Sequence, residues 1–335
     1  MTATTVSAAR QSSPGWLKNL RTLVSGQEGA LTLSLVLLVI VVGTANPRFL
    51  AQQNISDILL NSSYIAVAAI GMSAVIISGN IDISVGAMIG VLATISGQLS
   101  IVPGMPIWIS WLVPLIVGPL IGAVTGFLVA YLRIPSIVVS LGMMSILKGG
   151  LILATGGVWI YNMPPEYKLA QQSFLGLPVP VYFMLVLTIL AALWMRYSPS
   201  GRAIYAVGGN KEAALLSGIS SRTVLMRVFM FNGLMVGISS VLFATQFSSI
   251  QSTVPNGLEL TIITSAVVGG VSILGGTGTV IGATLATILL RAIGNGMIFI
   301  NVSAYWLQAV QGTLILVTVL IDLLRRRRQA AQIRG

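Results

Sequence analysis

Few side chains in this 335-residue sequence are suited to acid–base, redox or metal chemistry. The chain has no histidine and no cysteine, and it has only seven aspartates and glutamates. Thiolate or imidazole nucleophiles, Cys/His zinc sites and histidine-ligated haem are therefore excluded. The glycine-rich stretch GGTGTVIG (residues 275–282) has no lysine to reach a phosphate, so it is not a nucleotide-binding loop. We expect no enzymatic activity, no bound cofactor and no metal.

The carboxylates are also poorly placed for a carrier driven by protons or ions, which usually holds such groups inside its membrane spans. Asp82, in SGNIDISVGAMIG, and Glu259 are the two that could act at membrane depth. Two interpretations of Asp82 stand side by side: a substrate or coupling role, and a helix N-cap that accepts from the amide of Ser84 or Val85. The other five fall in loops or at span ends: Glu28, Asp57, Glu166, Glu212 and Asp322.

Composition identifies the elements that must position these residues. The chain is 55% hydrophobic and 7% charged, whereas soluble surfaces carry roughly 25–35% charged residues. Its apolar runs reach the ~20 residues that a helix needs to cross a membrane, and they lack the alternation of barrel strands. We predict an all-α polytopic membrane protein of about ten transmembrane helices. The expected spans are 29–45, 58–79, 83–100, 107–132, 136–156, 179–195, 223–245, 258–274, 278–299 and 303–322.

The net charge of +11 is arranged as in membrane proteins whose cationic loops stay in the cytoplasm. Cations precede the first span, surround the loop between the sixth and seventh spans, and follow the last span. We therefore expect both termini in the cytoplasm, contact with lipid headgroups rather than nucleic acid, and a place in the bacterial cytoplasmic (inner) membrane. The predicted domains are a cytoplasmic segment 1–28, a permease domain 29–322 with cytoplasmic loop 196–222 and outer loop 157–178, and a basic tail 323–335.

Two glycine-rich segments interrupt the helical pattern, and both are placed on the cytoplasmic side. Non-helical backbone there must be satisfied by protein or by a water-filled cavity. One interpretation is close helix packing through the pairs Gly86/Gly90 and Gly278/Gly282. The other adds a moving gate in the transport pathway. The gate and pathway candidates are Asp82, Ser84, Gly86, Gly275, Gly276 and Gly278.

The stretch GGNKEAALLSGI (residues 208–219) reads as a short helix of a soluble protein. Asn210 is suited to cap its first turn, Glu212 complements the helix dipole, and Gly218 is suited to end it in the left-handed conformation. Such a helix is too short to be stable alone. We expect an apolar face of Ala213, Leu216 and Ile219 that docks in a groove of a cytoplasmic partner, with the lipid interface as the alternative.

Four stretches together resemble a known family. GNIDISVG (79–86), RIPSIVVSLGMMSILKGG (133–150), GRAIYAVGGNKEAALLSGI (201–219) and VVGGVSILGGTGTVIGA (267–283) are similar to permease subunits of bacterial ATP-binding-cassette importers of the ribose/monosaccharide branch. They stand in the order of that family, which more often reads GIDLSVG in the first motif.

The resemblance implies that this permease works with other subunits. These are two cytoplasmic ATPase subunits that use ATP, a second permease that is identical or related, and an extracytoplasmic sugar-binding protein. It also implies that the short helix contacts the ATPase. The residues that take this coupling role are Gly209, Asn210, Glu212, Ala213, Ala214 and Gly218.

The outer loop (TGGVWIYNMPPEYKLAQQSFLGLPVP, 155–180) carries aromatic side chains. Trp159, Tyr161 and Tyr167 are candidates for docking the binding protein or for an interfacial aromatic belt. The sequence of this loop resembles that of rhamnose and autoinducer-2 permeases more than that of ribose permeases. We therefore predict a permease for a monosaccharide or autoinducer-2-like solute. The alternatives are a stand-alone secondary carrier or facilitator for a small polar solute, and a structural membrane scaffold.

Overall fold

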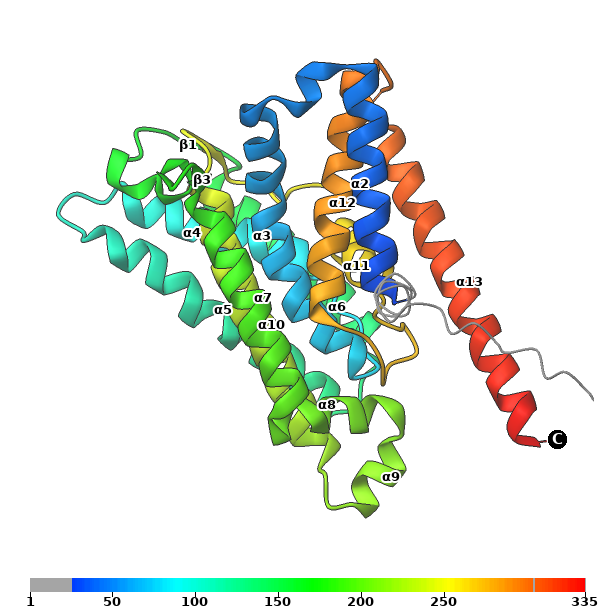
Figure 1. Cartoon of the computed structure of the whole chain (residues 1–335). Helices are drawn as coiled ribbons and strands as arrows, with labels where there is room; N and C mark the ends of the chain where they lie inside the picture. Colours follow the sequence, from blue (N-terminus) through cyan, green and yellow to red (C-terminus); the bar gives the residue numbers. More distant parts are fainter. Residues whose placement is uncertain (1–25, 304, 335) are drawn as a thin grey trace, which may run out of the picture.

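The computed structural model describes residues 26–303 and 305–334, with side chains in the last helix described as far as Leu324 (Figure 1). Most of the predicted N-terminal segment, residues 1–25, therefore lies outside the described residues, and the predicted basic tail is described mainly by its backbone. Long helices dominate the described part, and the only strands there form two short antiparallel pairs on one end of the bundle. The membrane helices are α2 (Gln27–Ala45), α3 (Gln52–Ile77), α4 (Val85–Ser100), α5 (Ile107–Ala130), α6 (Ser136–Thr155), α7 (Val179–Tyr197), α10 (Ser221–Ala244), α11 (Leu258–Val268), α12 (Val280–Phe299) and α13 (Trp306–Arg334).

Each of the ten predicted spans corresponds to one of these helices, which confirms the all-α polytopic class. Eight of the helices are long and apolar enough to cross a membrane. The two shorter ones, α4 and α11, span roughly 24 Å and 17 Å at 1.5 Å per residue, less than the ~30 Å hydrocarbon layer. Their N-terminal ends meet inside the bundle: a Cβ added at Gly86 would lie 3.0 Å from the amide nitrogen of Glu259.

Helix α3 lies at the centre of the bundle. In its most apolar window 89% of the residues are buried by other parts of the chain, against 17% in α2 and α6 and 6% in α13. Helices α10, α12, α7 and α11 pack around α3. The peripheral helices present their apolar side chains outward, as expected of surfaces that face lipid or another membrane subunit. Apolar sequence alone thus marks the spans, and packing identifies the inner ones.

Helices α5 and α10 approach each other closely because small residues line both contact faces. A Cβ at Gly118 would overlap the carbonyl oxygen of Gly233, and one at Gly237 would lie 2.5 Å from that of Pro114. Such contacts allow backbone-to-backbone packing, which substitutes for the weak hydrophobic driving force between helices in lipid. Helices α5 and α10 thus form a closely packed pair beside α3 and α4.

The two ends of the bundle differ. At one end lie α8 (Pro199–Gly209), α9 (Lys211–Leu216) and the C-terminal end of α13 (Figure 1). The start of α2 reaches the same end, since Gln27 donates to the carbonyl oxygen of Val268 and Glu28 accepts from Thr279. At the other end lie the 3-10 turns η1 (Pro47–Leu50), η2 (Pro165–Tyr167) and η3 (Leu169–Gln171), with strand β1 (Trp159–Ile160) paired to β4 (Ile250–Gln251) and β2 (Ser173–Phe174) paired to β3 (Leu177–Pro178). The start of α2 and the C-terminal end of α13 thus lie at the same end of the bundle as α8 and α9, and the prediction that this end faces the cytoplasm stays a prediction.

Candidate functional site

The short helix α9 forms by the local chemistry that its sequence predicts. The side-chain oxygen of Asn210 accepts from the amides of Glu212 at 2.9 Å and Ala213 at 3.0 Å. Gly218 adopts φ +79°, the left-handed conformation that ends a helix without strain on a side chain. The carboxylate of Glu212 lies in the first turn, near the positive end of the helix dipole.

The exposed face of α9 differs in part from the predicted one. Leu216 is 90% exposed and Leu215 is 65% exposed, so two large apolar side chains project from this end of the bundle. Ala213 is also exposed, whereas Ala214 is buried against the protein. Ile219, predicted on the same outer face, instead packs against the main core because the left-handed Gly218 turns the chain back. The apolar surface available to a partner is therefore Ala213, Leu215 and Leu216.

Helix α8 connects this surface to the interior. It begins at Pro199 with Ser198 as its cap and ends at Gly209, where Gly208 lies directly against the carbonyl oxygen of Ile77 at the end of α3. The amide of Gly276 donates to the same Ile77 carbonyl oxygen at 2.8 Å. A Cβ added at Gly208 would overlap both atoms. Three segments far apart in sequence therefore meet at one point, which we call the glycine junction: Gly208–Gly209, Ile77–Gly79 and Gly275–Gly276.

A second contact strengthens the glycine junction. The Tyr205 hydroxyl, on α8, donates to the carbonyl oxygen of Gly278 at 2.9 Å. Gly278 has φ +144°, and an added Cβ there would lie 2.7 Å from the Cα of Val271, so the loop between α11 and α12 can take this path only with glycine. Displacement of α8 would therefore act directly on the α3–α4 connection and on the α11–α12 loop.

Asp82 lies in the α3–α4 connection and is fully buried. One carboxylate oxygen accepts from the amide of Ser84 at 3.0 Å and from its hydroxyl at 2.6 Å, and the other accepts from the side-chain amide of Asn232 at 3.0 Å. The structure thus shows Asp82 accepting the Ser84 amide just before α4. The bond to Asn232, in the middle of α10, was not predicted, because the two residues are 150 positions apart.

The paired glycines are packing positions, as the first interpretation held. An added Cβ at Gly86 would lie 2.6 Å from a carboxylate oxygen of Glu259, and one at Gly90 would lie 2.9 Å from the Cα of Val254. Gly282 lies directly against the carbonyl oxygen of Gly269. These glycines bring α4 and α12 against the residues around α11. Their role as a gate stays a prediction.

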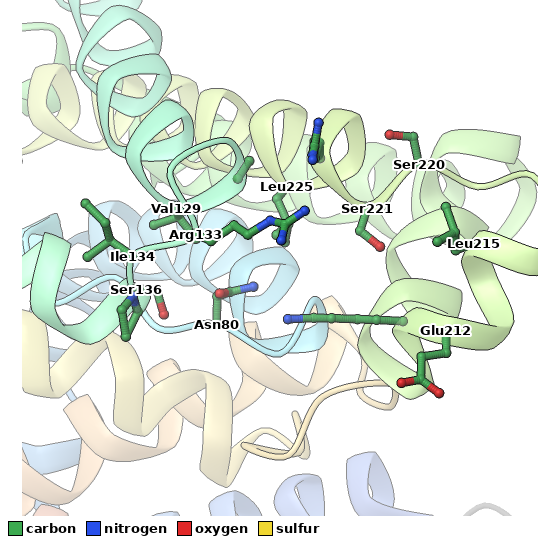
Figure 2. A pocket seen from close by; sticks show the side chains of 14 residues that line it. Asn80, Val129, Arg133, Ile134, Ser136, Glu212, Leu215, Ser220, Ser221 and Leu225 are labelled. Atoms are coloured by element: carbon green, nitrogen blue, oxygen red, sulfur yellow. The ribbon is translucent and has the colours of Figure 1, made fainter.

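A cavity of about 820 Å³ separates α9 from the turn between α5 and α6 (Figure 2). Arg133, on that turn, points into the space, while the carboxylate of Glu212 points away from it (Figure 2). Lys211 and Arg222 also line the cavity, so its charge is net positive. Asn80, from the α3–α4 connection, lines its inner wall. The space lies between α9 and the interior of the bundle.

The three aromatic residues predicted to dock the binding protein do not share one exposed surface. Trp159 and Tyr161 stack with ring centroids 6.2 Å apart and are about half exposed, so they remain candidates for a docking surface. Tyr167 is fully buried, and its hydroxyl is hydrogen-bonded to that of Ser96 at 2.8 Å. The prediction that Tyr167 takes part in docking is wrong for this reason: it anchors the loop to α4 instead.

Helix α6 carries a polar face that the sequence prediction passed over. Ser145, Lys148, Gly149 and Gly150 are all exposed in the middle and outer part of the helix. An added Cβ at Gly149 or Gly150 would meet no atom within 4 Å. A lysine inside a span is unusual on a lipid-facing surface. The sequence SILKGG could have indicated this polar face, because it places a lysine inside an apolar span.

Comparison with known proteins gives one family and a consistent set of relatives. Residues 54–319 match the family described as "Branched-chain amino acid transport system / permease component". The chain is 32% identical over 304 residues, 90% of its length, to the autoinducer 2 import system permease protein LsrC of Yersinia pseudotuberculosis serotype O:1b (strain IP 31758), covering 86% of that protein. The LsrC protein of Yersinia pestis (strain Pestoides F) matches with the same identity and coverage. No solved structure matches the chain significantly.

Proposed function

Since the chain belongs to the family of permease components of the branched-chain amino acid transport system, we propose that it forms the membrane pathway of an ATP-driven solute importer. As a permease of this family it is a multi-pass protein of the cytoplasmic membrane. In the proposed assembly, two cytoplasmic ATPase subunits bind and hydrolyse ATP. A second permease, identical or related, completes the pathway. An extracytoplasmic binding protein delivers the solute.

One observation carries the proposal: the surface of α9 that projects from the bundle is connected to the interior by the glycine junction. Leu215 and Leu216 are large, apolar and exposed, which suits insertion into a groove of a partner protein. Gly208 contacts the end of α3, and Tyr205 donates to Gly278 of the α11–α12 loop. Motion of an ATPase that grips α9 would thus reach both interior loops through one rigid helix, α8.

The polarity of the bundle interior and the names of the relatives indicate which class of solute the chain transports. The two LsrC relatives are named as permeases of autoinducer 2 import systems. The interior of the bundle has few charged groups, so we propose that the binding protein supplies most of the selectivity. The solute class is a small polyhydroxylated molecule, a monosaccharide or an autoinducer-2-like compound.

The partner permease is proposed to lie against α6. Its exposed Lys148 is poorly suited to lipid, and a mostly apolar cavity between α4 and α6, which Gly150 also lines, leaves room there for a side chain of another subunit. Small residues permit close approach of another helix, and a lysine is stable where it faces water in a pathway.

The decisive experiment changes one exposed leucine at each end of the molecule. Leu216→Asp places a charge on the proposed ATPase-binding surface, whereas Leu175→Asp changes a leucine that is 83% exposed in the outer loop. Co-purification with the ATPase and binding-protein subunits of the transporter measures the effect. We expect Leu216→Asp to lose the ATPase while its melting temperature stays that of the wild type, and Leu175→Asp to retain the ATPase. Equal ATPase recovery with both variants would contradict the proposal.

The family membership favours this function over a stand-alone carrier, and a transport measurement separates the two. Purified alone in liposomes, the chain should import no sugar down a gradient. With the ATPase and binding protein added, it should import solute only when ATP is present. Gradient-driven uptake by the chain alone would establish the carrier instead.

A further inference from the structure

A cavity lined in part by polar side chains lies between the outer parts of α11, α12 and α13. Its volume is about 320 Å³, at the lower end of the ~300–1,000 Å³ typical of small-molecule sites. Asn256 and Gly257 enter it just before α11, Thr261 lines it from α11, and Gln308 and Gln311 line it from α13. Amides and hydroxyls thus converge on a space that is bounded elsewhere by apolar membrane helices.

Arg291, on α12, is the only charged residue among the described residues that line this cavity. It lies roughly 12 Å along α12 from the outer end of the helix at Phe299. One of its terminal nitrogens donates to the Tyr64 hydroxyl at 2.9 Å, and the guanidinium lies 5.9 Å from the centre of that ring. Among the described residues no carboxylate forms an ion pair with it, and its Nε atom is buried without a hydrogen-bond partner.

An arginine held this way is energetically unfavourable unless something completes its hydrogen bonds. Charged groups inside membrane spans are rare because their desolvation is costly, and they mark substrate pathways by default. A buried donor without an acceptor adds to the cost. On the same side of α12, one turn further, the side-chain oxygen of Asn295 is also buried without a partner. The Tyr64 hydroxyl accepts from one N–H group of Arg291. The other N–H groups of the guanidinium can donate to a group with oxygen acceptors.

We propose that this cavity is a subsite of the transport pathway, in which Arg291 and the amides of Gln308 and Gln311 hold the hydroxyl or anionic oxygens of the solute during import. The subsite rests on the proposed importer function and adds to it a place and a recognising residue. Arginine suits this task because its planar guanidinium donates in several directions and stays charged. The amides can donate and accept, which matches vicinal hydroxyl groups.

The test reconstitutes the complete transporter, with its ATPase and binding protein, in liposomes. Arg291→Gln removes the charge, and Gln311→Glu places a carboxylate inside the cavity, where it competes with the solute for Arg291. Arg48→Gln is the control, since Arg48 is an exposed arginine at the outer end but outside the cavity. Both solute import and ATP hydrolysis are measured, with rhamnose, ribose and autoinducer 2 as solutes.

We expect the number of solute molecules imported per ATP to fall by roughly tenfold or more in both cavity variants. The rate of ATP hydrolysis stimulated by the loaded binding protein should stay within about twofold of that of the control. Import per ATP equal to that of Arg48→Gln would overturn the subsite. Failure of the wild-type complex to couple import to ATP would instead overturn the importer function, so the two failures are distinguishable.

A second measurement does not depend on transport. Because the chain has no cysteine, a single Gln308→Cys reports on access to the cavity through its rate of reaction with a maleimide. The same solutes, added to this variant in the assembled complex, should slow the reaction. The protection should disappear when Arg291→Gln is added and persist with Arg48→Gln. Protection that survives the loss of Arg291 would also overturn the proposal.

Discussion

Single residues in this protein differ in how far their sequence neighbourhood determines what they do. Asn210 and Gly218 were predicted as the start and end of α9 because capping depends on the next few residues only, and the structure confirms both. The partner of Asp82 could not be found this way, since Asn232 comes from another helix. The same holds for Tyr167, whose burial depends on the distant Ser96. Local chemistry is predictable from sequence, and long-range polar pairs are not.

The Asp82 contacts predict which substitutions the site tolerates. Asp82→Asn keeps a side-chain oxygen for Ser84. Its new amide can donate to the oxygen of Asn232 once the Asn232 amide rotates, so one polar atom of Asn232 is without a partner both before and after the change. Asp82→Ala leaves the Ser84 and Asn232 donors unpaired, which destabilises by about 1–3 kcal/mol. We expect a clearly lower melting temperature for Asp82→Ala and a nearly unchanged one for Asp82→Asn.

Transport by the Asp82→Asn protein separates the two roles considered for this carboxylate. If Asp82 serves as a hydrogen-bond acceptor, ATP-dependent import stays close to that of the wild type. Import lost at an unchanged melting temperature would show that the negative charge itself takes part in coupling or substrate passage.

At the scale of elements, the hydrophobic pattern predicted where the helices are, and packing set their lengths. All ten predicted spans are helices, but α4 and α11 are shorter than predicted, and α11 ends at Val268 where 274 was expected. The reason lies in the glycine-rich connections: backbone from Gly269 onward turns through positive φ angles at Gly270, Gly275, Gly276 and Gly278. Apolar residues such as Val271 and Ile273 continue the hydrophobic run, so composition alone extends the helix too far.

The glycine junction predicts a sharp difference between two adjacent residues of α8. Gly208→Ala introduces a Cβ that overlaps the carbonyl oxygen of Ile77 and lies 2.8 Å from the amide nitrogen of Gly276, whereas an added Cβ at Gly209 meets no atom within 4 Å. Overpacking of this kind typically destabilises by about 1–3 kcal/mol. We expect Gly208→Ala to lower both the melting temperature and the coupling of ATP hydrolysis to import.

Gly209→Ala is the matched control, because it adds the same methyl group to the same helix at the neighbouring position. It should behave as the wild type in both measurements. If the two variants were indistinguishable, α8 would not press on α3 and the α11–α12 loop as the glycine junction requires, and coupling would have to pass by another route.

At the scale of the whole molecule, charge distribution predicts which end of the bundle faces the cytoplasm, and the structure places the start of α2, helices α8 and α9 and the C-terminal end of α13 together at that end. What the sequence did not indicate is which helices are surrounded by their own chain. Helices α3 and α6 have comparable mean hydropathy, 1.8 and 2.0, yet their most apolar windows are 89% and 17% buried. Hydropathy measures the preference for leaving water, and both lipid and protein satisfy it. The open side of α6 was visible only once the fold was known.

That open side yields a prediction about assembly, which the absence of native cysteine makes clean to test. Gly149→Cys places one thiol on the exposed polar face of α6, and Leu190→Cys places one on the exposed apolar face of α7. Each is labelled with a benzophenone maleimide in membranes that contain the whole transporter, and then illuminated. Benzophenone reacts with nearby C–H bonds, so it captures an identical or a related permease equally well.

We expect the α6 probe to give a product with the mass of two permeases, and mass spectrometry of that product to show which permease is the neighbour. The α7 probe should react mainly with lipid, because Leu190 lies among apolar side chains that face outward. A two-permease product from α7 and none from α6 would place the second subunit on the opposite side of the bundle. Lys148 would then need another explanation, since a cation exposed on a span is stable only where protein, water or a headgroup can solvate it.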